Sequence, residues 1–317
     1  MDTTDTPLRP AAWPADDTTI VTDGGLETWL MFHRGIDLPA FAAYPLASDE
    51  AGRRLLVDYY RRYLSIAADT RSAVLLETPT WRANPDWGRE LGHDPETLET
   101  MLTAAVRVVL DLRGEWVGPQ PLLVSGAVGP RGDGYVADTA MTVDEAAGYH
   151  SFQVERMTAD GVDLVTALTI GDVAEAAGFA LAARRAGVPS VVSFTVETDG
   201  RLPSGTLLGE AIDRTDELTD GAPMHYMVNC AHPTHFASLL DGSPSWTDRI
   251  GGVRANASMR SHAELDEMDH LDEGDAADLA ERYQGLLRNL PAARVLGGCC
   301  GTDERHVGAI VQACRVG

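Results

Sequence analysis

Hydrophobic and polar positions follow a repeating order along the chain, in which short apolar, often β-branched runs alternate with longer amphipathic stretches. This order is typical of repeated strand–helix units. The sequence predicts eight strands, over residues 19–22, 73–78, 122–126, 162–168, 190–196, 225–229, 250–255 and 294–298. Eight such units predict an α/β protein, a single-domain (β/α)8 TIM barrel with its site at the C-terminal face of the strands. An open doubly wound sheet shares the alternation and is the alternative.

Capping signals mark several of the predicted helices. Asp94 stands at the start of one helix, Thr142 and Glu145 have the spacing of a capping box, and Gly187 suits a left-handed C-cap. The helices are predicted over residues 94–113, 142–160, 172–186, 206–219, 275–289 and 303–315.

Composition narrows the range of functions. The 317 residues include 25 basic and 48 acidic ones, a formal net charge of −23, and every basic residue is an arginine. A surface this negative repels nucleic acid and anionic lipid, so we expect neither as a partner. The lack of lysine excludes Schiff-base chemistry, pyridoxal-phosphate attachment and a phosphate-loop lysine.

The chain shows no sign of a membrane or export segment. No apolar run approaches the roughly 18 residues of a membrane span, and the N-terminus lacks the pattern of a signal peptide. We therefore expect a cytoplasmic protein. Because no linker interrupts the repeated units, we expect one barrel domain over residues 19–317, preceded by a flexible N-terminal extension, residues 1–18.

Three of the four cysteines directly follow predicted strands. Cys230 follows the sixth strand, and Cys299 and Cys300 follow the eighth. The C-terminal ends of barrel strands meet on one rim, so the topology predicts that these thiols converge. Three thiolates there can hold a tetrahedral zinc ion, one per chain, with one position open. Buried apolar cysteines, a vicinal disulfide and a single nucleophile are the alternatives.

The proposed ligand set suggests a reaction class. Three thiolates give the zinc site a net negative charge, which suits the binding of a fourth sulfur better than the activation of water. This predicts a methyltransferase in which a thiol takes a methyl group from a small sulfonium or ammonium donor, or from S-adenosylmethionine. Hydrolysis by metal-bound hydroxide and a non-catalytic zinc- or thiol-binding role are the rival hypotheses.

From about residue 20 to the C-terminus, the chain resembles the zinc-dependent homocysteine S-methyltransferases. The resemblance is carried by five segments: 22–28 (TDGGLET), 126–130 (GAVGP), 161–164 (GVDL), 228–230 (VNC) and 297–302 (GGCCGT). It implies that the three cysteines are the zinc ligands and that homocysteine is converted to methionine. It also implies that Asp23, Gly24 and Gly25 contact the amino-acid end of homocysteine.

Further candidates come from the strand ends and from the aromatic residues. Polar side chains at or near strand ends are expected to help bind the acceptor: Glu27, Glu77, Thr78, Glu197, Asn229 and Asn256. Aromatic side chains that could face a cationic donor are Trp29, Trp81, Trp87 and Tyr135. Loop hydrogen bonding and ordinary packing are the alternative roles.

One position departs from the family pattern. Many members carry a glutamate after the fourth strand that helps hold the homocysteine ammonium, and Leu168 occupies the matching position here. Losing that carboxylate weakens ammonium binding unless Glu77 or Glu197 replaces it; otherwise the acceptor is a different thiol. The expected partners are a small-molecule thiol and a methyl donor, with a homo-oligomer left open.

Overall fold

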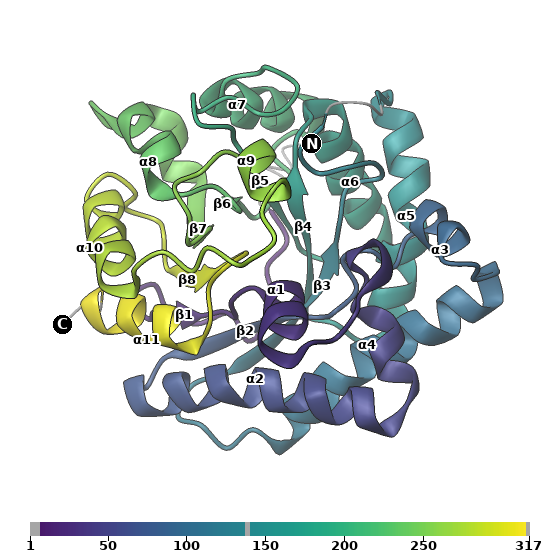
Figure 1. The fold of residues 1–317 in the computed structure, drawn as a ribbon. Coiled ribbons are helices and arrows are strands. Elements are labelled where there is room, and N and C mark those ends of the chain that lie inside the picture. The colour runs from purple at the N-terminus through teal and green to yellow at the C-terminus, as the bar shows by residue number, and fades with distance from the viewer. Residues whose placement is uncertain (1–6, 137–139, 315–317) are drawn as a thin grey trace.

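Eight parallel strands close into a barrel in chain order, with β8 paired to β1. The computed structural model describes residues 7–136 and 140–314. The strands are β1 (Ile20–Val21), β2 (Ala73–Glu77), β3 (Leu122–Val128), β4 (Leu164–Ile170), β5 (Ser190–Phe194), β6 (His225–Asn229), β7 (Ile250–Ala255) and β8 (Val295–Gly298). Figure 1 shows the helices arranged in a ring around these strands. The predicted TIM barrel is confirmed, and the open doubly wound sheet is wrong.

Helices connect successive strands. The longer ones are α2 (Glu50–Thr70), α4 (Pro95–Glu115), α5 (Val143–Asp160), α6 (Val173–Ala186), α7 (Leu208–Thr219), α10 (Ala276–Leu287) and α11 (Glu304–Ala313). Short helices are α1 (Leu26–Thr28), α3 (Pro85–Glu90), α8 (Pro233–Phe236) and α9 (His262–Asp266). Single turns complete the list: η1 (Trp29–His33), η2 (Pro39–Phe41), η3 (Tyr44–Ser48), η4 (Ala237–Leu240) and η5 (Ser245–Arg249).

The capping signals are confirmed. Asp94 accepts a hydrogen bond from the Thr97 amide, Thr142 forms a complete capping box with Glu145, and Gly187 has φ +72°. The predicted list lacked α2, which Asp49 caps at its N-terminus. The strand predicted over residues 162–168 lies two residues further on, because α5 ends in a left-handed turn at Gly161. Residue 315, the predicted end of the last helix, lies outside the described residues.

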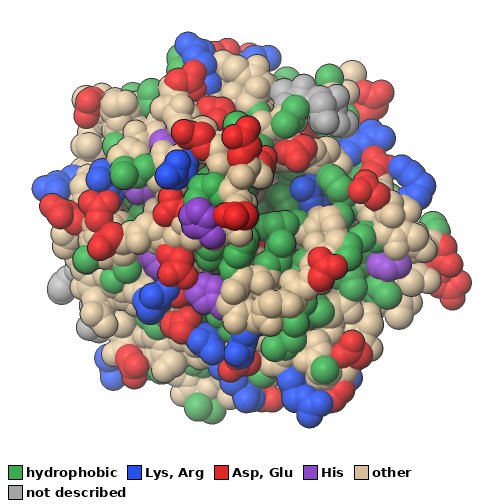
Figure 2. Space-filling model, in the orientation of Figure 1, with side chains coloured by type: hydrophobic (Ala, Val, Ile, Leu, Met, Phe, Trp, Pro, Cys, Tyr) green, Lys and Arg blue, Asp and Glu red, His purple; other side chains and the backbone are tan. Residues whose placement is uncertain are grey.

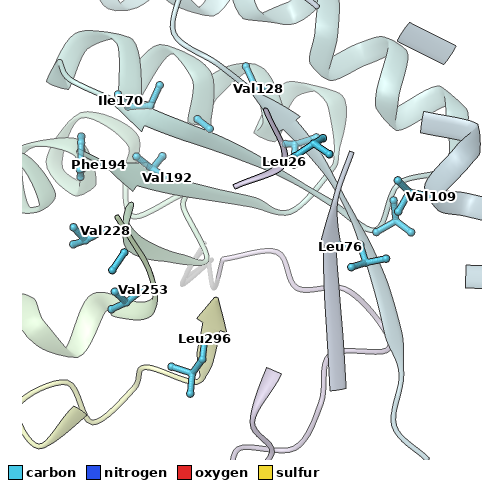
Figure 3. Close-up of a cluster of buried hydrophobic side chains, with 14 of the residues drawn as sticks. Leu26, Leu76, Val109, Val128, Ile170, Val192, Phe194, Val228, Val253 and Leu296 are labelled. Atoms are coloured by element: carbon cyan, nitrogen blue, oxygen red, sulfur yellow. The ribbon is translucent and has the colours of Figure 1, made fainter. Parts of the chain in front are cut away.

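Apolar side chains form two cores. Residues that point outward from the strands pack against the helices; Figure 3 shows part of this layer, including Leu76, Val192, Val228, Val253 and Leu296. A second cluster, with Leu75, Met227 and Val295 among its members, fills the inside of the barrel. Both follow from the alternation of side chains along a strand between the two faces of the sheet.

The inside of the barrel becomes polar toward the C-terminal ends of the strands. Two residues beyond Leu75 on the same face is Glu77, and two residues beyond Met227 is Asn229. On β7, Arg254 also lies at this level and contacts Glu77. The fold thus places a buried polar layer directly above an apolar floor.

The N-terminal segment lies against the opposite end of the barrel. The Trp13 ring centroid is 5.7 Å from that of His225, at the start of β6. Arg294 donates hydrogen bonds to the carbonyl oxygens of Ala15 and, at 3.5 Å, Thr18. Among the described residues, none of the helices combines the length and apolar character needed to cross a bilayer.

Candidate metal centre and substrate pocket

Cys230, Cys299 and Cys300 come together at the C-terminal end of the barrel. Cys230 is the first residue after β6, and the other two directly follow β8. Their three Sγ atoms all lie within 4.8 Å of one another, and those of Cys230 and Cys300 are 3.4 Å apart. Sulfurs bound to one tetrahedral zinc ion at about 2.3 Å are about 3.8 Å apart, so the three cysteines could hold a metal ion.

The backbone at the ends of β4 and β6 is strained next to the cysteine cluster. Thr169 and Cys230 adopt φ values of +63° and +55°, a left-handed conformation that costs a non-glycine residue about 1–2 kcal/mol. Asn229 braces both segments: its Oδ1 accepts hydrogen bonds from the Thr169 amide at 2.8 Å and from Ser193 Oγ at 2.7 Å. Strain of this kind gathers at functional sites, where the surrounding structure enforces it.

Two glycines allow the loops after β1 and β8 to pack together. A Cβ atom at Gly25 would lie 2.5 Å from Thr28 Oγ1 and 2.6 Å from the Cys299 carbonyl oxygen. Gly301 has φ +76°, which ends the turn carrying the two adjacent cysteines. Thr302 Oγ1 donates a 2.7 Å hydrogen bond to the Cys299 carbonyl oxygen and fixes that turn.

The three thiols do not ionise equally. Hydrogen bonds from Cys230 and Cys300, helped by the charge of Arg254, hold the pKa of Cys299 well below its usual range. The same interactions raise the pKa of Cys230 and of Cys300, because each neighbouring thiolate disfavours another. Of the three thiols, Cys299 therefore ionises most readily.

A second ring of side chains holds Cys230. The Tyr135 hydroxyl donates to Cys230 Sγ at 3.0 Å, and its ring lies 4.0 Å from that of His262. His262 Nε2 is 2.7 Å from the Cys230 carbonyl oxygen, while its Nδ1 is 3.1 Å from Glu197 Oε1. Asn256 contacts Cys230 Sγ at 3.8 Å. Glu197 and Asn256 thus support Cys230, and neither lines the pocket beside Cys299 and Cys300.

A pocket opens beside Cys299 and Cys300. Several predicted acceptor and donor residues line it: Asp23, Gly24, Gly25, Glu27, Glu77, Thr78, Trp81, Tyr135 and Asn229. Leu168 forms part of its wall. Figure 2 shows this end of the molecule as a hollow with a largely hydrophobic wall and with acidic and histidine side chains around it.

Arg254 is the charged centre of the pocket. Its Nη1 lies 2.9 Å from Asp23 Oδ1 and 3.8 Å from Glu77 Oε1, and it donates to Thr22 Oγ1 at 3.0 Å. Burial opposes the charge of Arg254, but Asp23 and Glu77 together raise its pKa. Burial also raises the pKa of Glu77 to about 7, although Arg254 lowers it, and burial raises that of Glu27 to about 7.

Two of the four aromatic residues predicted to face the donor line the pocket. Trp81 and Tyr135 line the pocket, but the Arg82 guanidinium lies 4.0 Å from the ring centroids of both Trp81 and Trp87. Trp29 lies outside the pocket lining, with Arg34 and Arg62 over its ring at 4.7 and 5.1 Å. Arginine side chains therefore already occupy faces of all three tryptophans.

The sequence interpretation missed Arg254 and Phe41. Arg254 is two residues after Gly252 on the inward face of β7, and this spacing is the signal that could have found it. Phe41 follows Ala40, and both have positive φ, +60° and +54°, in a turn that places Phe41 in the pocket lining. Nothing in the local sequence predicts that turn.

Comparison with known proteins agrees with the barrel fold and shows the family. Residues 20–314 match the profile of the family described as homocysteine S-methyltransferase. Homocysteine S-methyltransferase 4 of Zea mays is 27% identical over 318 residues, covering 93% of this chain and 89% of the maize protein. Two crystal structures of the Escherichia coli homocysteine methyltransferase MmuM, in its oxidized and metallated forms, superpose with TM-scores of 0.74 and 0.70 at 21% and 22% identity. Both alignments cover 93% of this chain and 95% of the MmuM chain.

Proposed function

This chain belongs to the homocysteine S-methyltransferase family, and we propose that it transfers a methyl group from a small sulfonium or ammonium donor to the thiol of homocysteine, giving methionine. Cys230, Cys299 and Cys300 hold one zinc ion in this proposal. The observation that carries it is the convergence of three sulfurs from two distant strand ends beside a pocket lined with carboxylates.

The donor set fits zinc. Thiolates select soft or borderline metals, and three of them leave a tetrahedral ion one further position. Cys299 is ready to bind as a thiolate because its neighbours lower its pKa, and binding of a cation removes the penalty that raises the pKa of the other two. When bound, zinc supplies a Lewis acid that lowers the pKa of a fourth sulfur and keeps it nucleophilic at neutral pH.

The chain's own residues orient the acceptor. Asp23 and the backbone of Gly24 and Gly25 lie in the pocket next to Cys299, where they meet the amino-acid end of homocysteine in this proposal. Arg254 donates to the Gly24 carbonyl oxygen at 3.4 Å and holds Asp23, so it fixes both from below. Tyr135 and His262 position Cys230, the ligand on the opposite strand end.

The donor enters on the aromatic side of the pocket. Phe41 and Tyr135 line the pocket and offer aromatic surface to a cationic donor, and the Glu27 carboxyl group lines the same pocket. In the transfer, the acceptor sulfur forms a bond to the methyl carbon while the donor's bond to that carbon breaks. The donor leaves as a neutral sulfide or amine, and the acceptor's thiol proton passes to solvent.

The test is methionine formation by the reduced, zinc-loaded protein. Homocysteine is offered with S-methylmethionine, betaine or S-adenosylmethionine, and methionine is measured by mass spectrometry. At least one donor is expected to give methionine, and Cys299→Ser is expected to abolish the reaction, whereas Cys314→Ser, a matched change at the end of α11, retains it. Failure of all donors despite stoichiometric zinc would favour a non-catalytic thiol-binding protein.

A further inference from the structure

Glu77 is a buried carboxylate at the wall of the pocket. It ends β2 with a relative exposure of 3% and lines the pocket. Neither of its carboxylate oxygens has a hydrogen-bond partner among the described residues. The hydroxyl groups of Ser125 and Thr166 lie near enough to lower its pKa, and one of their two hydrogens is used in the 2.7 Å bond between them. A carboxylate left in this state is costly unless a ligand completes it.

The charges around Glu77 leave one negative charge uncompensated. Arg254 contributes one positive charge to two buried carboxylates and lies closer to Asp23, at 2.9 Å, than to Glu77, at 3.8 Å. Its other donors are taken by Thr22 Oγ1 and by the carbonyl oxygens of Gly24 and Gly298. The charge balance of the cluster therefore leaves room for one cation, and Glu77 faces the pocket from which a ligand can supply it.

The other candidate side chains are weaker partners for a cation than Glu77. Leu168, on β4, presents an apolar side chain to the pocket. Glu197, the other candidate acid, has its Oε1 3.1 Å from His262 Nδ1 and is outside the pocket lining. Glu27 also lines the pocket, but its side chain is less deeply buried than that of Glu77, so leaving it without a cation costs less.

We propose that Glu77 binds the ammonium group of the acceptor, so that the acceptor of this chain is a thiol carrying an α-amino group. The inference rests on the proposed function and names the residue that recognises the amino group of the acceptor. In this arrangement the carboxylate that recognises the ammonium comes from β2, and β4 contributes only the apolar wall at Leu168.

Binding of two thiols that differ by one amino group tests this inference. The ligands are homocysteine and 4-sulfanylbutanoic acid, which is homocysteine without its amino group, and their affinities for the zinc-loaded protein are measured by titration calorimetry. We expect the wild type to bind homocysteine about 10- to 100-fold more tightly, the range for a hydrogen bond between charged groups. Glu77→Gln should remove this preference, and Glu77→Asp should keep part of it.

Two variants make the test specific. Glu281→Gln, the same chemical change at an exposed position of α10 outside the pocket lining, should leave the preference as in the wild type. Adding Leu168→Glu to Glu77→Gln should restore the preference from β4. Zinc content and the urea midpoint of each variant show that it is folded and loaded.

An unchanged preference in Glu77→Gln would overturn the inference, as would an equal loss of affinity for both thiols. Methionine formation is measured separately with the wild type. If no donor gives methionine, the proposed function fails, while the binding preference still decides the role of Glu77.

Discussion

Replacing Arg254 with methionine removes a cation from the centre of the buried polar layer. The guanidinium is 5% exposed and lies 2.9 Å from Asp23 and 3.8 Å from Glu77. Methionine fills a similar volume but leaves both carboxylates without a positive charge. Breaking a buried ion pair from one side costs about 3–5 kcal/mol, because the remaining charge stays buried and unpaired. We expect Arg254→Met to lose stability of this size at pH 8.

The loss should depend on pH in a definite direction. Even beside Arg254, burial raises the pKa of Glu77 to about 7, and without the cation it rises further. A carboxyl whose pKa is higher in the folded than in the unfolded state loses stability as pH rises through the folded value. In the wild type, the titration of Glu77 lowers the free energy of unfolding by about 1.4 kcal/mol per pH unit only up to pH 7. In the variant, whose Glu77 pKa is higher, this decrease continues above pH 7. The difference between the two proteins should therefore be about 1 kcal/mol larger at pH 8 than at pH 6.

Urea unfolding of both proteins at pH 6 and pH 8 measures this difference. Both are treated with a chelator, because a bound metal would add its own stabilisation. Arg260→Met is the control: Arg260 is 53% exposed and pairs with Asp272 at 3.4 Å, so its loss should cost less than about 1 kcal/mol. A variant within about 1 kcal/mol of the wild type at pH 8, or a larger loss at pH 6, would refute this account of the cluster.

Two further predictions concern packing around the barrel. Burial lowers the pKa of His225 to about 3, against about 6.5 in the unfolded chain, so acidification from pH 7 to pH 5 should cost about 2 kcal/mol of stability. His225→Gln should lack this part of the pH dependence in urea unfolding; an equal slope would contradict it. Gly25→Ala should cost about 1–3 kcal/mol and weaken metal binding, because its Cβ collides with the Cys299 carbonyl. Gly148→Ala, in α5 with nothing within 4 Å, should instead raise the thermal midpoint.

The convergence of the cysteines follows from topology that the sequence reveals. Each lies directly after a strand, and a closed parallel barrel brings all C-terminal strand ends to one rim. The distance of 70 positions between Cys230 and Cys300 is therefore no obstacle. The place of Asp23 and Glu77 in the pocket can be predicted from the sequence in the same way, because they stand at the ends of the first two strands.

Side-chain pairing could not be predicted in the same way. The aromatic character of Trp81 and Trp87 suggested a surface for a cation, but the helical turn at α3 places Arg82 between their rings. Tyr135 was expected to face the donor. It does line the pocket, but its hydroxyl also donates to Cys230 Sγ. These pairings depend on loop conformation, which hydrophobic periodicity does not encode.

Zinc content, measured in the reduced protein by inductively coupled plasma mass spectrometry, shows directly whether Cys230, Cys299 and Cys300 together bind one zinc ion. Four variants are compared with the wild type: Cys230→Ser, Cys299→Ser, Cys300→Ser and Cys314→Ser. We expect about one zinc per chain in the wild type and in Cys314→Ser, and little or none in the other three, because removing one of three thiolates leaves too few ligands. Full zinc content in Cys299→Ser would contradict this expectation.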